Sequence, residues 1–235
     1  MRKIIFWICI PLIGIMQSCS DTVVGEGDVI TNKRKVSTFK RIKVEATADI
    51  YVNISTINEL TVTAQKNIEE LIHTKVIDET LIIYSDKVYS TDEGVVIQLN
   101  SNDLSYIKAS GAGNVFCKAP LTTQDLDLEL SGAGTMELNV AAITVSADLS
   151  GAGLIKLKGN CNEAKYKVSG AGKLDAFELV ADECKVDLSG IGVAEVNASE
   201  ELNASVSGAG NVYYTGAATN LKTNISGLGK VERKN

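Results

Sequence analysis

The chain has 235 residues, a formal net charge of −6 and 45% hydrophobic residues. This length suits one large domain or two small ones. The net negative charge and the absence of arginine between Arg41 and Arg233 argue against nucleic-acid binding, because phosphate contacts need a basic surface. Only 5% of the residues are aromatic and 20 are glycine, which favours a thin core filled by Val, Leu, Ile and Ala.

Residues 1–19 have the pattern of a bacterial lipoprotein signal peptide. A positively charged start is followed by an apolar run over residues 4–16, which is too short to cross a bilayer comfortably. The Ser18-Cys19 pair then resembles a lipobox, in which the cysteine is acylated and becomes the new N-terminus. We therefore expect lipidation of Cys19 and attachment to a membrane, since several acyl chains anchor a protein stably. The alternative is an ordinary secretory leader in which Cys19 is incidental.

The residues after Cys19 bear on location. Ser20 stands where an aspartate would favour the inner membrane, by analogy with the common sorting rule for lipoproteins. We therefore expect the outer membrane of a Gram-negative bacterium, with the periplasmic or surface face left open. Residues 20–35 are rich in Gly, Asp, Thr and Val, and this composition predicts a tether.

The segment 36–109 contains short apolar runs that read as strands, with one helical turn expected over 67–73. The runs are residues 42–44, 50–54, 60–63, 81–84 and 95–99. We interpret 36–109 as irregular first coils that cap one end of a larger stack, because the terminal repeats of a solenoid are atypical. Residues 232–235 supply charge at the other end.

From residue 110 onward the chain repeats. Ser-Gly-Ala-Gly or a close variant begins about 19 residues apart at Ser110, Ser131, Ser150, Ser169, Ser189, Ser207 and Ser226. The flanking residues alternate between apolar and polar, as in a strand with one buried face. This pattern predicts that each unit contains a strand, a glycine corner, a second strand and a short returning segment such as residues 160–165.

Such units bury their apolar faces only by stacking on one another. We therefore expect residues 36–235 to form one all-β domain, a right-handed parallel β-helix (β-solenoid) with coils of about 19 residues. The seven Ser-Gly-x-Gly repeats occupy residues 110–235.

The paired glycines of each motif are expected to form the corners, where glycine accepts positive φ angles that other residues avoid. They are Gly111, Gly113, Gly132, Gly134, Gly151, Gly153, Gly170, Gly172, Gly190, Gly192, Gly208, Gly210, Gly227 and Gly229. The residue between them is Ala except for Ile191 and Leu228, and we interpret it as a small filler inside the corner. The motif serines are expected to stack as a ladder of hydroxyls. A catalytic serine would need a base, and the single histidine, His73, lies outside the repeats.

Two stretches carry a resemblance to a known family. Residues 36–44 (Val-Ser-Thr-Phe-Lys-Arg-Ile-Lys-Val) and 104–113 (Leu-Ser-Tyr-Ile-Lys-Ala-Ser-Gly-Ala-Gly) resemble the opening and the first glycine corner of the head GIN domain family. That family carries the label "putative auto-transporter adhesin" and is common in the envelopes of gut and environmental Gram-negative bacteria. The resemblance covers about residues 36–235. It implies an adhesin-like envelope protein and no catalytic residues.

The outward charges have a structural and a functional interpretation. Two columns of alternating sign would stabilise neighbouring coils by about 0.2–1 kcal/mol per pair: Glu137, Lys156 and Asp175, and Asp148, Lys167 and Asp187. In contrast, Asp127, Glu129 and Asp148 would gather three carboxylates on one face. Oxygen ligands suit Ca²⁺, so a calcium site is one hypothesis, and a solvated acidic face is the other. No other metal site and no cofactor is expected.

The cysteines of the repeats also leave two alternatives. Cys117 and Cys184 fall at inward positions, and Cys161 lies near one period before Cys184. A Cys161–Cys184 disulfide is one hypothesis in an oxidising envelope. Buried thiols that behave as small apolar side chains are the other.

Two functions remain in competition. The anchor, the regular stack and the lack of a catalytic set favour a non-enzymatic binding module that presents its surface to a glycan or a protein. Phe116, Tyr213 and Tyr106 are expected to face outward from separated coils, too far apart for a joint sugar platform. The alternative is a polysaccharide lyase or hydrolase on a β-helix, which would show a cleft of clustered, unpaired titratable groups. A binding module would show paired charges. The oligomeric state stays open.

Overall fold

The computed structural model describes residues 22–234. The expected leader and the lipidation candidate Cys19 lie outside these residues. Within them the fold is nearly all β, and the one helix, α1 (Lys66–Glu69), has four residues. No helix of the described residues is long and apolar enough to span a membrane.

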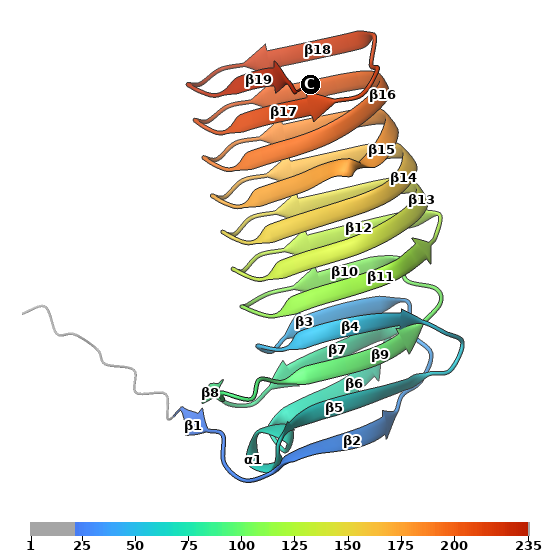
Figure 1. The fold of residues 1–235 in the computed structure, drawn as a ribbon, viewed down its shortest axis with the longest axis vertical. Coiled ribbons are helices and arrows are strands. Elements are labelled where there is room, and N and C mark those ends of the chain that lie inside the picture. The colour runs from blue at the N-terminus through green and yellow to red at the C-terminus, as the bar shows by residue number, and fades with distance from the viewer. Residues whose placement is uncertain (1–21, 235) are drawn as a thin grey trace, which may run out of the picture.

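The repeats form a stack of parallel coils (Figure 1). Their strands are β10 (Tyr106–Ala109), β11 (Asn114–Thr122), β12 (Asp125–Leu130), β13 (Thr135–Leu149), β14 (Leu154–Val168), β15 (Lys173–Leu188), β16 (Val193–Val206), β17 (Asn211–Thr215), β18 (Asn220–Ile225) and β19 (Lys230–Arg233). Equivalent residues pair in register, so that Lys156 lies between Glu137 and Asp175 of its neighbouring coils. The molecule is a β-solenoid of about seven turns with about 19 residues per turn, as the repeat predicts.

The coils are flattened into two layers of strands (Figure 1). One layer holds the segments that leave each glycine corner, such as the first half of β14. The other layer holds the segments that lead into the next corner, such as the second half of β14. The prediction of a separate returning segment at residues 160–165 is wrong, because these residues lie inside β14 and pair in register with β13 and β15. The chain instead returns through a bend within the long strand, where Gly159 has a φ of +115°.

The core is the narrow space between the two layers. The residue before the motif serine is at most 2% exposed in six repeats: Ala109, Leu130, Leu149, Val168, Leu188 and Val206. Burial of one such branched side chain contributes about 1.5–3 kcal/mol, and the contribution recurs in every coil. The seventh equivalent, Ile225, is 46% exposed, because it lies on the last described coil.

The corner glycines are required by the close approach of successive coils. A Cβ atom on Gly170 would lie 2.0 Å from the carbonyl oxygen of Gly151, and every motif glycine except Gly111 shows a contact of 2.8 Å or less. No side-chain carbon fits at these distances, so glycine is needed for close backbone approach. The prediction that the motif glycines have positive φ angles is wrong for all of these glycines except Gly111, whose φ is +138°.

The residue between the two glycines lies outside the corner, so the expected internal filler is also wrong. Ile191 is 70% exposed and Leu228 is 93% exposed, and the five alanines at this position are exposed as well. The motif serines lie on the outside too. Their backbone, rather than a ladder of hydroxyls, links the coils: the Ser169 N–H donates to the carbonyl oxygen of Leu149 at 2.9 Å.

The first strands continue the stack and then close it. They are β1 (Val23–Val24), β2 (Val29–Lys35), β3 (Arg41–Glu45), β4 (Asp49–Ile54), β5 (Glu59–Gln65), β6 (Ile72–Ile77), β7 (Thr80–Ser85), β8 (Tyr89–Ser90) and β9 (Val96–Ser101). β3, β4, β7 and β9 extend the parallel coils without the glycine motif. β2, β5 and β6 then pair antiparallel and, with α1, cover this end (Figure 1). The prediction of a tether over residues 20–35 is wrong for residues 29–35, which form β2.

A buried ion pair ties β2 to α1. Glu69 is 5% exposed, and the Arg34 guanidinium donates to its carboxylate and to the carbonyl oxygen of Ile72. Arg34→Ala would leave a buried carboxylate without its partner. We expect the free energy of unfolding to fall by about 3 kcal/mol, the low end for loss of one member of a buried pair, as measured by urea unfolding.

The adjacent Lys33 supplies the matched control. Its ion pair with Glu59 is exposed, with 72% of the lysine side chain open to solvent. Lys33→Ala should therefore cost less than about 1 kcal/mol. Equal losses in the Arg34 and Lys33 variants would show that the cap does not depend on the buried pair.

Candidate functional site

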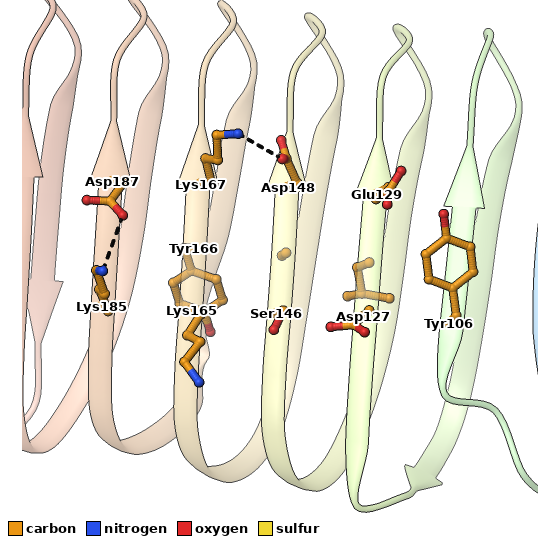
Figure 2. Close-up of a pocket in the computed structure, with 12 residues that line it drawn as sticks. Tyr106, Asp127, Glu129, Ser146, Asp148, Lys165, Tyr166, Lys167, Lys185 and Asp187 are labelled. Carbon is orange, nitrogen blue, oxygen red and sulfur yellow. Dashed lines mark ion pairs between the residues drawn. The ribbon is translucent and has the colours of Figure 1, made fainter.

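A groove of 390 Å³ runs across one face of the stack (Figure 2). It lies on the layer that leads into the glycine corners, over β10, β12 and the second halves of β13, β14 and β15. Because these strands pair in register, their outward side chains form two rows. One row is Tyr106, Asp127, Ser146, Lys165 and Lys185, and the other is Lys108, Glu129, Asp148, Lys167 and Asp187.

A small residue at the centre gives the groove its depth. Ser146 lies between the longer side chains of Asp127 and Lys165 in the first row. Behind the groove, the Tyr166 side chain fills the core (Figure 2). Its hydroxyl has no hydrogen-bond partner among residues 22–234, and burial raises its pKa well above the usual value.

Most of the charges around the groove are paired. Three lysine nitrogens lie within ion-pair distance of carboxylate oxygens: Lys108 with Glu129 at 2.6 Å, Lys167 with Asp148 at 3.4 Å and Lys185 with Asp187 at 3.8 Å. Figure 2 shows the pairs made by Lys167 and Lys185 as dashed lines. The hydrogen bond from Lys108 lowers the pKa of Glu129 below its usual value. Within the described part of the chain, Asp127 has no such ion-pair partner, so its carboxylate is available to a ligand.

Tyr106 closes one end of the groove (Figure 2). Partial burial, with the carboxylates of Glu129 and Asp127 nearby, raises the pKa of its phenol to about 12. The hydroxyl therefore stays protonated at neutral pH and is able to donate a hydrogen bond. An aromatic ring with a polar tip, beside an unpaired carboxylate, is a combination that recurs in binding sites for polar ligands.

The three carboxylates of the calcium hypothesis lie on this face. Glu129 of β12 and Asp148 of β13 are neighbours in register, but each has a lysine within ion-pair distance. Asp127 is the third. Among residues 22–234, no group of three or more acidic, histidine or cysteine side chains is placed to hold a metal ion. The geometry therefore favours a solvated face over a calcium site.

A second hollow lies on the other layer, around Tyr51 and Phe116. These residues pair in register on β4 and β11, and their rings stack with centroids 5.2 Å apart and planes 25° apart. The prediction of separated coils is wrong for Tyr106 and Phe116, which lie on β10 and β11 of one coil, in opposite layers on either side of the Ser110 corner. Tyr51 gives Phe116 an aromatic neighbour. The sequence interpretation missed Tyr51, because its strand lacks the glycine motif that reveals the register.

No cysteine or histidine of residues 22–234 lines the groove. Cys117, Cys161 and Cys184 are buried and free, and Cys161 pairs in register with Ala181 rather than with Cys184, so the disulfide hypothesis is not supported. Burial raises the pKa of Cys117 to about 11 and that of Cys161 to about 12, which keeps both thiols protonated and unreactive. His73 lies on β6 at the capped end.

Residues 38–218 match the model of a family described as "Putative auto-transporter adhesin, head GIN domain". A putative adhesin from Bacteroides fragilis is 28% identical, with a TM-score of 0.86 over 90% of this chain and 100% of that one. A putative adhesin from Parabacteroides distasonis is 29% identical, with a TM-score of 0.72 over 91% and 100% of the two chains. A putative lipid binding protein from the same species shares the fold, with 22% identity and a TM-score of 0.74 over 91% and 100%. A search of curated proteins finds no match.

Proposed function

The chain belongs to the head GIN domain family of putative auto-transporter adhesins, and on this premise we propose that it is a non-enzymatic envelope protein that binds a glycan or a protein through the groove. The observation that carries the proposal is the pairing of charges around the groove. Paired charges on a rigid sheet suit recognition, whereas a polysaccharide lyase or hydrolase needs clustered, unpaired acids and bases.

The proposal includes a lipid anchor at Cys19 in the outer membrane. Its support is the leader pattern of residues 1–19 and the cysteine at its end. β1, which follows shortly after, lies at the capped end of the stack (Figure 1). An anchor there would hold the cap toward the membrane and leave the groove and the last coils accessible.

The groove is tested by filling it. Ser146→Trp puts a large ring at its centre without removing a charge, and the position already faces solvent. We expect the full-length protein, solubilised in detergent, to bind members of a glycan array or a protein array. The Trp variant should lose that binding by about tenfold or more, since a blocked site forfeits at least 1.4 kcal/mol of contact.

Asn203→Trp is the matched control. Asn203 pairs in register with Lys185, so it continues the same row on β16 beyond the groove, and its replacement should leave affinity unchanged. Equal loss in both variants, or no binding partner in either array, would contradict the proposal. Breakdown of acidic polysaccharides by the purified protein would favour the enzyme alternative.

A further inference from the structure

The last coil leaves the core open to solvent. All six residues of β18 are exposed. Leu221 and Ile225 occupy inward positions, in register with Leu202 and Val206 of the preceding coil. The exposed fractions of Leu221 and Ile225 are 47% and 46%, against 0% and 1% for their equivalents. Side chains that are core residues everywhere else therefore meet water at this end.

The same coil offers unpaired backbone. Among residues 22–234, β18 pairs with β16 alone and β19 pairs with β17 alone. Each strand therefore presents one edge of N–H and C=O groups, and such an edge is a template for the addition of another strand. Because β18 and β19 belong to different layers (Figure 1), the end of the stack presents two strand edges at once.

The opposite end is closed. There α1 and β6 cover the core, and Ile68 and Ile72 are 0% and 1% exposed. The edge strand β2 ends in three cations, Lys33, Arg34 and Lys35, and successive charges of one sign discourage strand addition. On β19, in contrast, the charges of Lys230 and Glu232 are opposite. A head-to-tail contact, which would propagate into a fibre, would therefore set the open coil against an end whose core is already covered.

We propose that two copies of the chain pair tail to tail through their last coils. A two-fold axis perpendicular to both layers sets β18 antiparallel to β18 of the second copy and β19 antiparallel to β19, so that both edges are satisfied together. Leu221 and Ile225 then continue the core across the contact. On β19, pairing centred on Val231 places Lys230 opposite Glu232 of the partner subunit, a favourable cross-strand pair.

A second copy fits this end better than an unrelated protein. It presents the same two edges, with the same separation between layers and the same twist, whereas another protein would have to match both edges separately. The closed cap stops growth after two copies. The pairing requires neither the ligand nor the anchor of the proposed function, so each stands or fails independently.

Sedimentation of the full-length protein, with detergent in excess so that each micelle carries one anchor, tests the pairing. We expect a dimer in equilibrium with monomer. The double change Leu221→Glu and Ile225→Glu should raise the dissociation constant by about tenfold or more, because it buries like charges at the contact. Ile191→Glu is the matched control, since Ile191 is 70% exposed on a corner away from this end, and it should leave the equilibrium unchanged.

Cross-linking gives a measurement that does not depend on how well the Glu variants fold. Glu232→Cys should couple to a second copy through a short bismaleimide, whereas Thr31→Cys on β2, at the capped end, should not. The native described thiols are buried and should stay unlabelled. A monomer at every concentration, equal weakening by Ile191→Glu, or coupling at position 31 in place of 232 would overturn the proposal.

Discussion

Gly170→Val is expected to lower the free energy of unfolding by about 3 kcal/mol or more, the upper end of the cost of overpacking. The physical reason is the contact between coils. A Cβ atom at Gly170 would lie 2.0 Å from the carbonyl oxygen of Gly151 and 2.9 Å from that of Ser150. Backbone atoms cannot rotate away as a flexible side chain does, so the coils must separate and lose their hydrogen bonds. For a domain of this size the melting temperature should fall by about 6–12 °C.

Two variants on the same coil separate this cause from a general effect of substitution. Ala171→Val adds a branched side chain at the next residue, which is exposed, and Ile191 already occupies the equivalent position. Lys167→Thr removes an exposed ion pair with Asp148 that contributes at most about 1 kcal/mol, and threonine suits a strand. Thermal unfolding of the three proteins should show a large shift for Gly170→Val alone. Three similar melting temperatures would mean that the coils are not in contact at the corner.

The coil and its register were predictable, because the same local pattern recurs in each repeat. Equivalent positions of successive repeats stack, so the columns through Lys156 and Lys167 could be predicted and have the expected register. The contacts that these two lysines make could not be predicted. Lys167 does reach Asp148, but the carboxylate within ion-pair distance of Lys156 is that of Glu178. Register depends on the backbone repeat, whereas the direction of a long exposed side chain depends on local rotamers.

The reason for the glycines was harder to infer than their position. Glycine serves both positive φ and close backbone approach, and a sequence pattern does not distinguish the two. A clue was present in Ile191 and Leu228, since a corner interior sized for alanine could not hold either. Their side chains in fact point to solvent, at 70% and 93% exposure. Variation in size at a repeated position therefore indicates an outward side chain.

The cap and the groove depended on contacts that no repeat reveals. β2 pairs with β5 across a long stretch of sequence, and its polar residues resembled a tether. Tyr51 stacks on Phe116 for the same reason, through a register between two segments without a shared motif. In the groove, the sequence predicts an acidic face at Asp127, but the depth at Ser146 depends on the register that sets the longer side chains of Asp127 and Lys165 on either side of it.

Cys19→Ala is expected to abolish the proposed attachment of the protein to the outer membrane. The proposed acyl chains insert with about 0.8 kcal/mol per buried CH₂ group, and several chains together make the attachment stable. Without the thiol that carries them, the protein should leave the outer-membrane fraction, either as a soluble periplasmic form or with its leader uncleaved. Incorporation of labelled palmitate should disappear at the same time. Cys9→Ala is the matched control, because Cys9 lies within the apolar run of the proposed leader and would be removed with it. An outer-membrane signal and palmitate label that persist in Cys19→Ala, or that vanish equally in Cys9→Ala, would show that Cys19 is not the anchor.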